Sequence, residues 1–244
     1  MLANNGIGYF VLGFKLIQSK GIKRFVFIPL IINIILFGAA FTYLFGRIDE
    51  LVTYFINLTP DWLAWIKDAI AFFVWPLAVI TILLFSAYVF STLANWIAAP
   101  FNGILSEKIE LQLTGKEDNT GTVFDAIKDV PRTFAREFIK LKYYLPRALV
   151  FLLAFFFLPV IGQIIWFVFG AWMMAVQYAD YPYDNHKISF DKMRADLRQK
   201  SGRSLSFGGV VMVFSMIPVI NLVVMPVAIC GATAMWVDHY RKLN

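Results

Sequence analysis

The apolar and charged residues of this 244-residue chain are separated into long blocks. Residues 25–46, 69–106, 148–179 and 204–237 contain no Asp, Glu, Lys, Arg or His, and these stretches are 22, 38, 32 and 34 residues long. A hydrocarbon core about 30 Å thick takes roughly 20 helical residues to cross. The pattern therefore predicts an all-α integral membrane protein, organised as a single membrane domain over residues 1–244, with a transmembrane helix at 25–46.

The second stretch, 69–106, predicts an interfacial lead-in followed by a second transmembrane helix. Pro76 is expected to kink or restart this helix, since proline disrupts the helical hydrogen-bond ladder. Pro100 followed by Asn102-Gly103 predicts a turn after the crossing, because these residue types favour turns.

The basic residues predict the topology. Of the 22 Lys and Arg residues, 20 lie in residues 1–24, 107–147, 180–203 and 238–244, whereas residues 47–68 carry four acids. The positive-inside rule makes 47–68 periplasmic and the four basic segments cytoplasmic, both termini included. The net charge of +6 is therefore interpreted as a topology signal, and no nucleic-acid-binding motif accompanies it.

The third and fourth stretches must then begin and end on the cytoplasmic side. Two full crossings and a turn take more than about 40 residues, so 148–179 and 204–237 are each predicted to form a re-entrant, hemi-penetrating helical hairpin. Each contains Pro-Val-Ile, at Pro159 and Pro218, where a proline ends a helix. The alternative is one long, proline-kinked helix per stretch, which would place 180–203 outside.

The cytoplasmic segments are predicted to be amphipathic helices. In 107–147 the apolar positions recur at helical spacing, with Pro131 interrupting them. In 180–203, Ser189 is a candidate cap and Gly202 a candidate end. The expected apolar faces are Phe124, Ile127, Phe134, Phe138, Leu141 and Leu145; then Phe190, Met193 and Leu197; and, near the start of the chain, Ile7, Phe10, Val11, Phe14 and Ile17.

The sequence carries no recognisable catalytic or metal-binding set. His186 and His239 are isolated, and Cys230 is a lone cysteine in an apolar stretch. We therefore expect no enzymatic activity, metal or cofactor. The apolar stretches also lack the Asp, Glu or His that proton-coupled carriers place in the membrane, which favours a passive pathway. Its uncharged polar lining would draw on Asn33, Asn95, Gln163 and Asn221, although amides also serve as helix-packing contacts.

The best candidate for an anion site is Gly21-Ile22-Lys23-Arg24, just before the first predicted transmembrane helix. A helix N-terminus presents unpaired N–H groups and a positive dipole, glycine lets an anion approach the backbone, and Lys23 and Arg24 add two charges. The competing interpretation is ordinary positive-inside flanking of a membrane helix.

Many unusual strings in this chain, in order and over nearly its whole length, match one known family. They are Gly21 to Phe25, Ile28-Pro29-Leu30 through Asn33, Ala94 to Gly103, Lys128-Asp129-Val130-Pro131-Arg132, Tyr144-Leu145-Pro146-Arg147-Ala148, Pro159 to Gln163, Asp180 to His186 and Gly231 to Asp238. On these strings the chain resembles the CysZ family of sulfate permeases of the bacterial inner membrane.

The resemblance implies sulfate uptake for cysteine biosynthesis, dimers or larger homo-oligomers, and two spanning helices plus two hemi-penetrating hairpins. It also implies sulfate binding at a Gly-Leu/Ile-Arg motif, which maps onto Gly21, Ile22 and Lys23, with Arg24 adjoining. Lys23 stands where the family usually has Arg, and lysine keeps the charge without the bidentate fork, so Arg24 carries more of the oxyanion geometry.

The leading hypothesis is therefore a sulfate channel or permease in the inner membrane, without proton coupling through a buried carboxylate. The alternative is a membrane accessory or scaffold subunit that binds sulfate and regulates another transporter. The same donors would also serve sulfite or thiosulfate.

Overall fold

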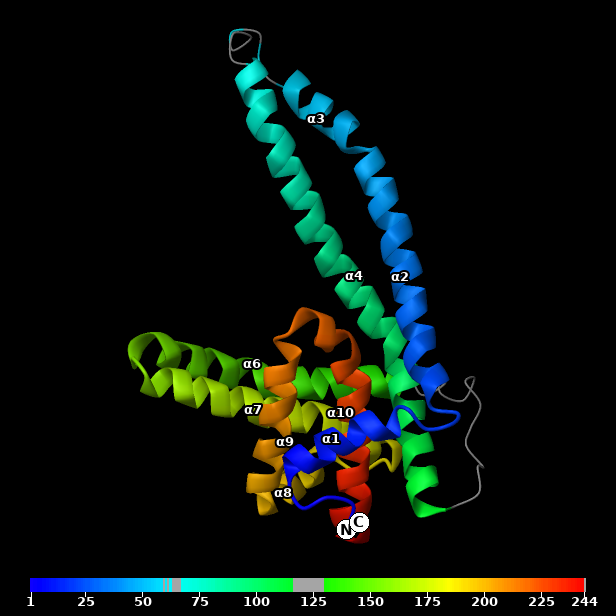
Figure 1. Ribbon diagram of the computed structural model, residues 1–244. Coiled ribbons are helices and arrows are strands. Elements are labelled where there is room, and N and C mark those ends of the chain that lie inside the picture. Colours follow the sequence, from blue (N-terminus) through cyan, green and yellow to red (C-terminus); the bar gives the residue numbers. More distant parts are fainter. Residues whose placement is uncertain (59, 61, 63–66, 116–129, 244) are drawn as a thin grey trace. The chain divides into compact units, whose positions relative to one another are not determined.

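The computed structural model describes residues 1–58, 60, 62, 67–115 and 130–243, and within them the only regular elements are helices (Figure 1). The chain divides into two compact units, which we call unit 1 (Met1–Phe27 and Ala99–Asn244) and unit 2 (Ile28–Ala98). The single membrane domain expected from the sequence stays a prediction, since two compact units can share one membrane.

Unit 2 contains α3 (Ile48–Asn57) and most of α2 (Lys23–Gly46) and α4 (Lys67–Thr114). At 1.5 Å per residue the 24 residues of α2 are about 36 Å long, more than the roughly 30 Å of a hydrocarbon core. Described apolar side chains on these helices are largely exposed, with Ile34 at 62% and Phe72 at 73%. Such exposure is typical of helices that face lipid rather than a water-excluded core.

Among the described residues, one helix is both long and apolar enough to cross a membrane, namely α7 (Ile161–Asn185). It continues six residues beyond the apolar stretch that ends at Ala179. The predicted crossings at 25–46 and 69–106 include residues whose side chains lie outside the described set. Both crossings therefore stay predictions, as does the depth to which either hairpin enters the membrane.

The turn predicted at Pro100 and Asn102-Gly103 is wrong, because α4 runs without a break from Lys67 to Thr114 through both Pro76 and this site. Packing within unit 1 holds this part of the helix. The Asn102 side chain is buried and donates to the Tyr181 hydroxyl at 3.2 Å, and the Gly103 carbonyl accepts from Asn185 Nδ2 at 3.0 Å. Tertiary contacts thus override a local turn preference.

Each of the last two apolar stretches contains a helix break at its Pro-Val-Ile string. α6 (Val130–Phe157) ends just before Pro159, and α7 begins at Ile161; α9 (Ser201–Ser215) is followed by α10 (Pro218–His239), with Pro218 in its first turn. The alternative of one continuous kinked helix in each stretch is therefore wrong. α6 also starts earlier than its stretch, and Pro131 lies at its beginning, where proline is tolerated, instead of interrupting it. Phe124 and Ile127 lie outside the described residues.

The first helix, α1 (Gly6–Leu16), packs against α9 and α10 through glycines. A Cβ atom at Gly13 would overlap the Val227 carbonyl oxygen, and one at Gly231 would overlap the Tyr9 carbonyl oxygen. The expected apolar face of α1 is therefore wrong in part: Phe10 is buried, but Ile7 and Val11 are 48% and 51% exposed. Backbone contact through glycine, not side-chain size, decides which face is buried.

The short helix α8 (Phe190–Gln199) matches its prediction closely. The Ser189 hydroxyl caps it by accepting from the Lys192 N–H at 3.3 Å, and Phe190, Met193 and Leu197 are buried. The end predicted at Gly202 is wrong, because that glycine lies in the first turn of α9. The chain closes with a short 3-10 helix, η2 (Arg241–Leu243).

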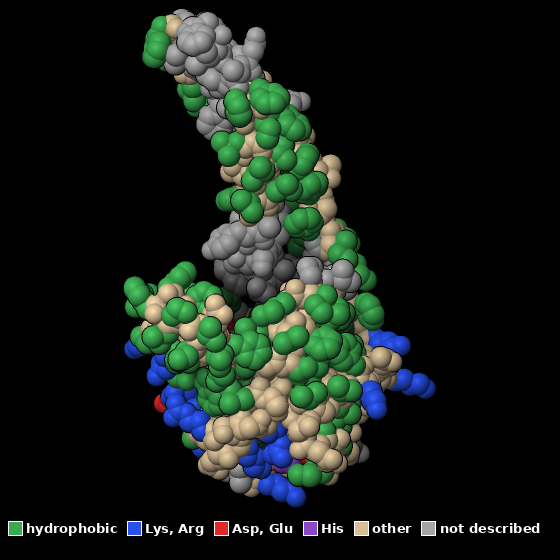
Figure 2. All heavy atoms as spheres, turned by 60° about the vertical axis from the view of Figure 1, so that its left-hand side comes forward, with side chains coloured by type: hydrophobic (Ala, Val, Ile, Leu, Met, Phe, Trp, Pro, Cys, Tyr) green, Lys and Arg blue, Asp and Glu red, His purple; other side chains and the backbone are tan. Residues whose placement is uncertain are grey.

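Unit 1 has an unequal distribution of side-chain types over its surface. On the face shown in Figure 2, hydrophobic side chains cover the upper part of this unit, whereas the Lys and Arg side chains gather toward its lower end. The exposed apolar residues include Phe156, Phe157, Ile161, Met216 and Ile217, which lie next to the two helix breaks. The hairpin ends are thus apolar, while the opposite end is basic.

Candidate functional site

The turn between α1 and α2 has an open backbone at Gly21. This glycine has a φ of +85°, a left-handed conformation that side chains rarely adopt, and no atom lies within 4 Å of the position of a Cβ. Its neighbour Ile22 is 3% exposed and anchors the turn in the core of unit 1. Ser19 fixes the preceding residues, since its hydroxyl donates to the Leu16 carbonyl at 2.6 Å and its Oγ also lies 3.0 Å from Gln112 Oε1.

Two exposed cations, Lys23 and Arg24, form the first residues of α2. The Arg24 guanidinium lies 4.9 Å from the centroid of the Phe25 ring. Within the described part of the chain, neither cation forms an ion pair. The first N–H groups of a helix also lack intrahelical acceptors. In α2 the Phe25 N–H is already bonded to the Ile22 carbonyl at 3.0 Å, so an open glycine, the positive end of the helix dipole and two exposed charges together make a surface that favours an oxyanion.

Only two of the four pathway candidates have described side chains, so a common polar lining stays a prediction. Gln163 lies in the first turn of α7 and Asn221 in the first turn of α10, and both are exposed near the hairpin ends. The side chains of Asn33 and Asn95 lie outside the described residues. Among the residues that are described, no hydrogen bond joins Gln163 or Asn221 to the Gly21–Arg24 turn.

Sequence reasoning missed a buried charged cluster between α6 and α7. Asp180 is 3% exposed, and its carboxylate accepts from Arg136 Nε at 2.8 Å and lies 3.2 Å from Lys140 Nζ. One helical turn further along, Arg132 pairs with Asp184 at 2.6 Å. Burial lowers the pKa of Lys140, but the carboxylates of Asp180 and Glu137 more than compensate and raise it above its usual value.

The charges of this cluster compensate one another, so its cations are not available to a ligand in the way that Lys23 and Arg24 are. Its role is to hold α6 against α7. A signal for it exists in the sequence: Arg132, Arg136 and Lys140 recur every four residues, and so do Asp180 and Asp184. Two antiparallel helices with these spacings place opposite charges face to face.

The family model described as Sulfate transporter CysZ/Etoposide-induced protein 2.4 matches residues 9–226, which is most of the chain. The matched region includes the Gly21–Arg24 turn, both helix breaks and the buried charged cluster.

Proposed function

Since the chain belongs to the Sulfate transporter CysZ/Etoposide-induced protein 2.4 family, we propose that it is a permease that conducts sulfate into the cytoplasm through the bacterial inner membrane. The family is of a transporter type, which is not an enzyme class, and a transporter of sulfate acts at a membrane. The proposed sulfate site is the turn Gly21-Ile22-Lys23-Arg24. The uptake would supply sulfur for cysteine biosynthesis.

The observation that carries this proposal is the pair of exposed, unneutralised cations at the start of α2, beside a left-handed glycine with open space around it. Sulfate is a doubly charged oxyanion whose oxygens accept hydrogen bonds from several directions at once. Lys23 offers a mobile point charge, whereas Arg24 offers a planar fork that can hold two oxygens. Sulfite and thiosulfate present similar oxygens, so the proposed site would accept them as well.

We infer passive conduction, without a proton-carrying carboxylate. The four apolar stretches contain no Asp, Glu or His, and the buried Asp180 next to one of them is already held by two cations. A conducting pathway also requires binding weak enough for release, which suits an exposed site better than an enclosed one.

The proposed membrane arrangement has both termini in the cytoplasm, with α2 and α4 crossing and the two hairpins entering from the cytoplasmic side. Support comes from the basic segments, the length of α2 and the apolar hairpin ends of unit 1. We also propose that the chain forms dimers or larger homo-oligomers. Two of its four apolar stretches are proposed to cross the membrane only in part, so further copies of the chain would complete the conducting pathway.

The test is the uptake of labelled sulfate by liposomes that contain the purified protein. We expect uptake above that of empty liposomes, and a reduction of roughly tenfold or more in Lys23→Gln with Arg24→Gln, since hydrogen bonds to charged groups contribute about 1.5–3 kcal/mol. Lys142→Gln is the matched control, because it removes one exposed charge from α6, outside the turn. Uptake equal to that of empty liposomes under every gradient would contradict conduction.

Two further measurements separate the alternatives. Sulfate binding without flux would favour an accessory or scaffold subunit that regulates another transporter. A proton gradient imposed at a constant sulfate gradient should leave the initial rate unchanged, and a clear acceleration would contradict passive conduction. If wild type and Arg24→Gln bind sulfate equally well, Lys23 and Arg24 are ordinary positive-inside residues that flank a membrane helix.

A further inference from the structure

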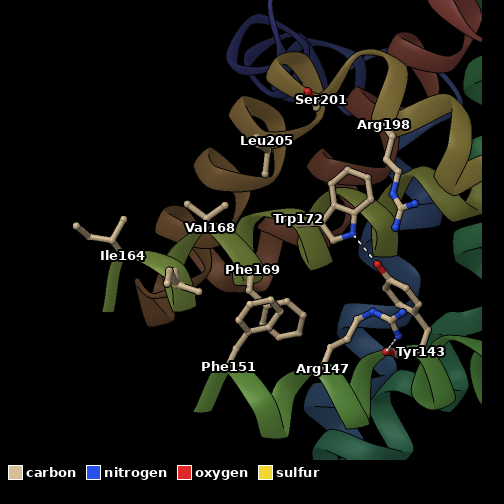
Figure 3. A pocket seen from close by; sticks show the side chains of 11 residues that line it. Tyr143, Arg147, Phe151, Ile164, Val168, Phe169, Trp172, Arg198, Ser201 and Leu205 are labelled. Atoms are coloured by element: carbon tan, nitrogen blue, oxygen red, sulfur yellow. Dashed lines mark hydrogen bonds between the residues drawn. The ribbon is translucent and has the colours of Figure 1, made fainter. Parts of the chain in front are cut away.

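A cavity of about 570 Å³ lies within unit 1 among α6, α7, α8 and α9 (Figure 3). Its size falls in the range of small-molecule sites, which is roughly 300–1,000 Å³. One part of its lining is polar and basic, and the rest is apolar. It lies outside the turn at Gly21–Arg24, and the proposed conduction of sulfate does not use it.

The polar part is formed by Arg147 of α6, Arg198 of α8 and Ser201 at the start of α9. Arg147 donates from Nη1 to the Tyr143 carbonyl at 2.8 Å, and its guanidinium lies 3.9 Å from the Tyr143 ring centroid. Neither Arg147 nor Arg198 pairs with a carboxylate in the described residues, and no Asp or Glu lines the cavity. Two positive charges therefore face one cavity without compensation.

In Figure 3 the Tyr143 ring lies beside Arg147, and the Trp172 ring lies beside Arg198. The Trp172 Nε1–H donates to the Tyr143 hydroxyl at 3.1 Å, which fixes both rings at the edge of the cavity. Trp and Tyr are enriched where a membrane protein passes from the headgroup layer to the hydrocarbon. The polar part of the cavity thus has the side chains expected at headgroup depth.

The apolar part follows α6 and α7 toward the end of their hairpin. Phe151 contacts Phe169 with ring centroids 4.6 Å apart, and Ile164 and Val168 are 60% and 46% exposed. Beyond them Phe157 at the hairpin end is 77% exposed. The cavity is therefore continuous with an exposed apolar surface, so a ligand longer than the cavity can extend along it.

We propose that this cavity binds one anionic phospholipid of the surrounding bilayer. The phosphate binds at the polar part of the cavity, where Arg147 and Arg198 attract it, and the upper part of one acyl chain lies along Phe151, Ile164 and Val168. The charge explains the preference for an anionic over a zwitterionic lipid, and basic pockets between membrane helices are known to hold such headgroups. The inference rests on the membrane location that the family implies, and it does not depend on the conduction of sulfate.

The test is a lipid titration of the full-length purified chain in detergent, read by native mass spectrometry. We expect one phosphatidylglycerol per chain to bind at least tenfold more tightly than phosphatidylcholine. Arg147→Gln with Arg198→Gln should remove this preference, because two charge-assisted contacts to phosphate are lost. Lys142→Gln with Lys242→Gln is the matched control, since it removes two exposed charges elsewhere and should keep the preference.

A second variant tests the apolar part while both arginines remain. Val168→Trp fills the space proposed for the acyl chain, so we expect phosphatidylglycerol binding to fall at least fivefold while helical circular dichroism is retained. Equal binding of the two lipids to wild type would overturn the proposal, and so would an unchanged preference in the double arginine variant. Displacement of the lipid by equimolar glycerol 3-phosphate or sulfate would also overturn it, because the site would then recognise a free anion.

The two proposals fail separately. Lipid binding is measured without a sulfate gradient, and a protein that conducts no sulfate can still retain phosphatidylglycerol. Conversely, loss of the lipid preference leaves the Lys23 and Arg24 variants as an independent test of sulfate uptake.

Discussion

The hairpins α6–α7 and α9–α10 share a Pro-Val-Ile break and an aspartate near their exit, yet they use that aspartate differently. In α6–α7, Asp180 is bound by Arg136 and Lys140 from its own hairpin. In α9–α10, Asp238 accepts from the Tyr9 hydroxyl at 2.7 Å and from the Leu2 N–H, both at the N-terminal end of the chain. The aspartate thus joins α7 to α6 in the first hairpin, whereas in the second hairpin it binds the N-terminal segment of the chain.

The two hairpins also differ in what covers their apolar residues. In α9–α10, Phe207, Val211 and Val227 are fully buried, and α1 lies against both helices. In α6–α7 the residues Leu149, Leu153 and Phe156 are at least half exposed. The hairpin α9–α10 and the C-terminal half of α7 thus belong to the core of unit 1, whereas α6 presents an apolar surface.

The comparison is tested most strongly by removing the charge of Asp180. Asp180→Asn removes the carboxylate from Arg136 and leaves the buried Lys140 with only the half-exposed Glu137, so we expect the free energy of unfolding to fall by about 3–5 kcal/mol. In thermal unfolding followed by tryptophan fluorescence, the midpoint should fall by roughly 6 °C or more. The control is Glu137→Gln, which removes a 45% exposed partner of the same lysine and should cost under about 1 kcal/mol. Equal falls of the melting midpoint in the two variants would contradict the proposal that buried charge pairs hold α6 against α7.

The contact between the hairpins is tested by a pair of adjacent glycines in α9. A Cβ at Gly208 would overlap the Ala171 carbonyl oxygen of α7, whereas at Gly209 the nearest atom is 3.8 Å away. We therefore expect Gly208→Ala to destabilise the protein by about 1–3 kcal/mol. Gly209→Ala should be neutral or stabilising by up to about 1 kcal/mol, since alanine favours the helix. The midpoints of thermal unfolding decide, and the reverse order would show that the two helices do not pack closely here.

The role of Asp238 in holding the N-terminal segment predicts a smaller and more local effect. Asp238→Asn weakens the contacts to Tyr9 and Leu2, so we expect a loss of about 1–2 kcal/mol. Amide hydrogen exchange of α1 should accelerate while that of α6 stays unchanged. Asp191→Asn is the control, because it removes an exposed ion pair with Arg194 within α8. Acceleration of α6 to the same extent as α1 would contradict a local role.

The smallest expected effect is a pH dependence that originates at His239, the last residue of α10. Burial, together with the charges of Arg203 and Lys200, lowers the pKa of His239 below 6.5, although Asp238 opposes them. A group with a lowered folded-state pKa gives stability above its unfolded pKa, and that stability is lost as pH falls. The melting midpoint should therefore fall as pH decreases from about 6.5 toward 5, and His239→Gln should flatten this slope. If the melting midpoint depends on pH equally in wild type and His239→Gln, another group is responsible for the pH dependence.

The positions of the hairpin breaks could be predicted from the sequence because proline acts locally. Pro159 and Pro218 remove helical hydrogen bonds in stretches of limited length, and both lie at breaks. Pro100 carries the same local signal but lies inside α4, where Asn102 and Gly103 are bonded to α7. Whether a proline ends a helix therefore depends on partners that are far away in the sequence.

The candidate site likewise contains features that the sequence predicts locally, and the charged cluster contains features that depend on distant partners. The charges of Lys23 and Arg24, the open glycine and the start of a helix are contiguous, so the sequence alone could place them together. The cluster around Asp180 joins residues about 40 positions apart in the sequence. Each of its charges, taken alone, resembles an exposed residue that flanks a membrane helix, so the sequence did not predict that they are buried together. The prediction of the buried face of α1 is wrong in part for a related reason. A pattern of apolar side chains does not include Gly13, which faces α10 through its backbone.

The close fit of α1 against α10 has a consequence for biosynthesis. α1 leaves the ribosome long before its partner α10, and the Leu2 N–H is bound to Asp238, which lies 236 residues further along the chain. All of unit 2 is translated in the interval. Unit 1 can therefore close only after α10 has been translated, and until then α1 is an apolar helix without its partner, free to bind the membrane surface or a chaperone.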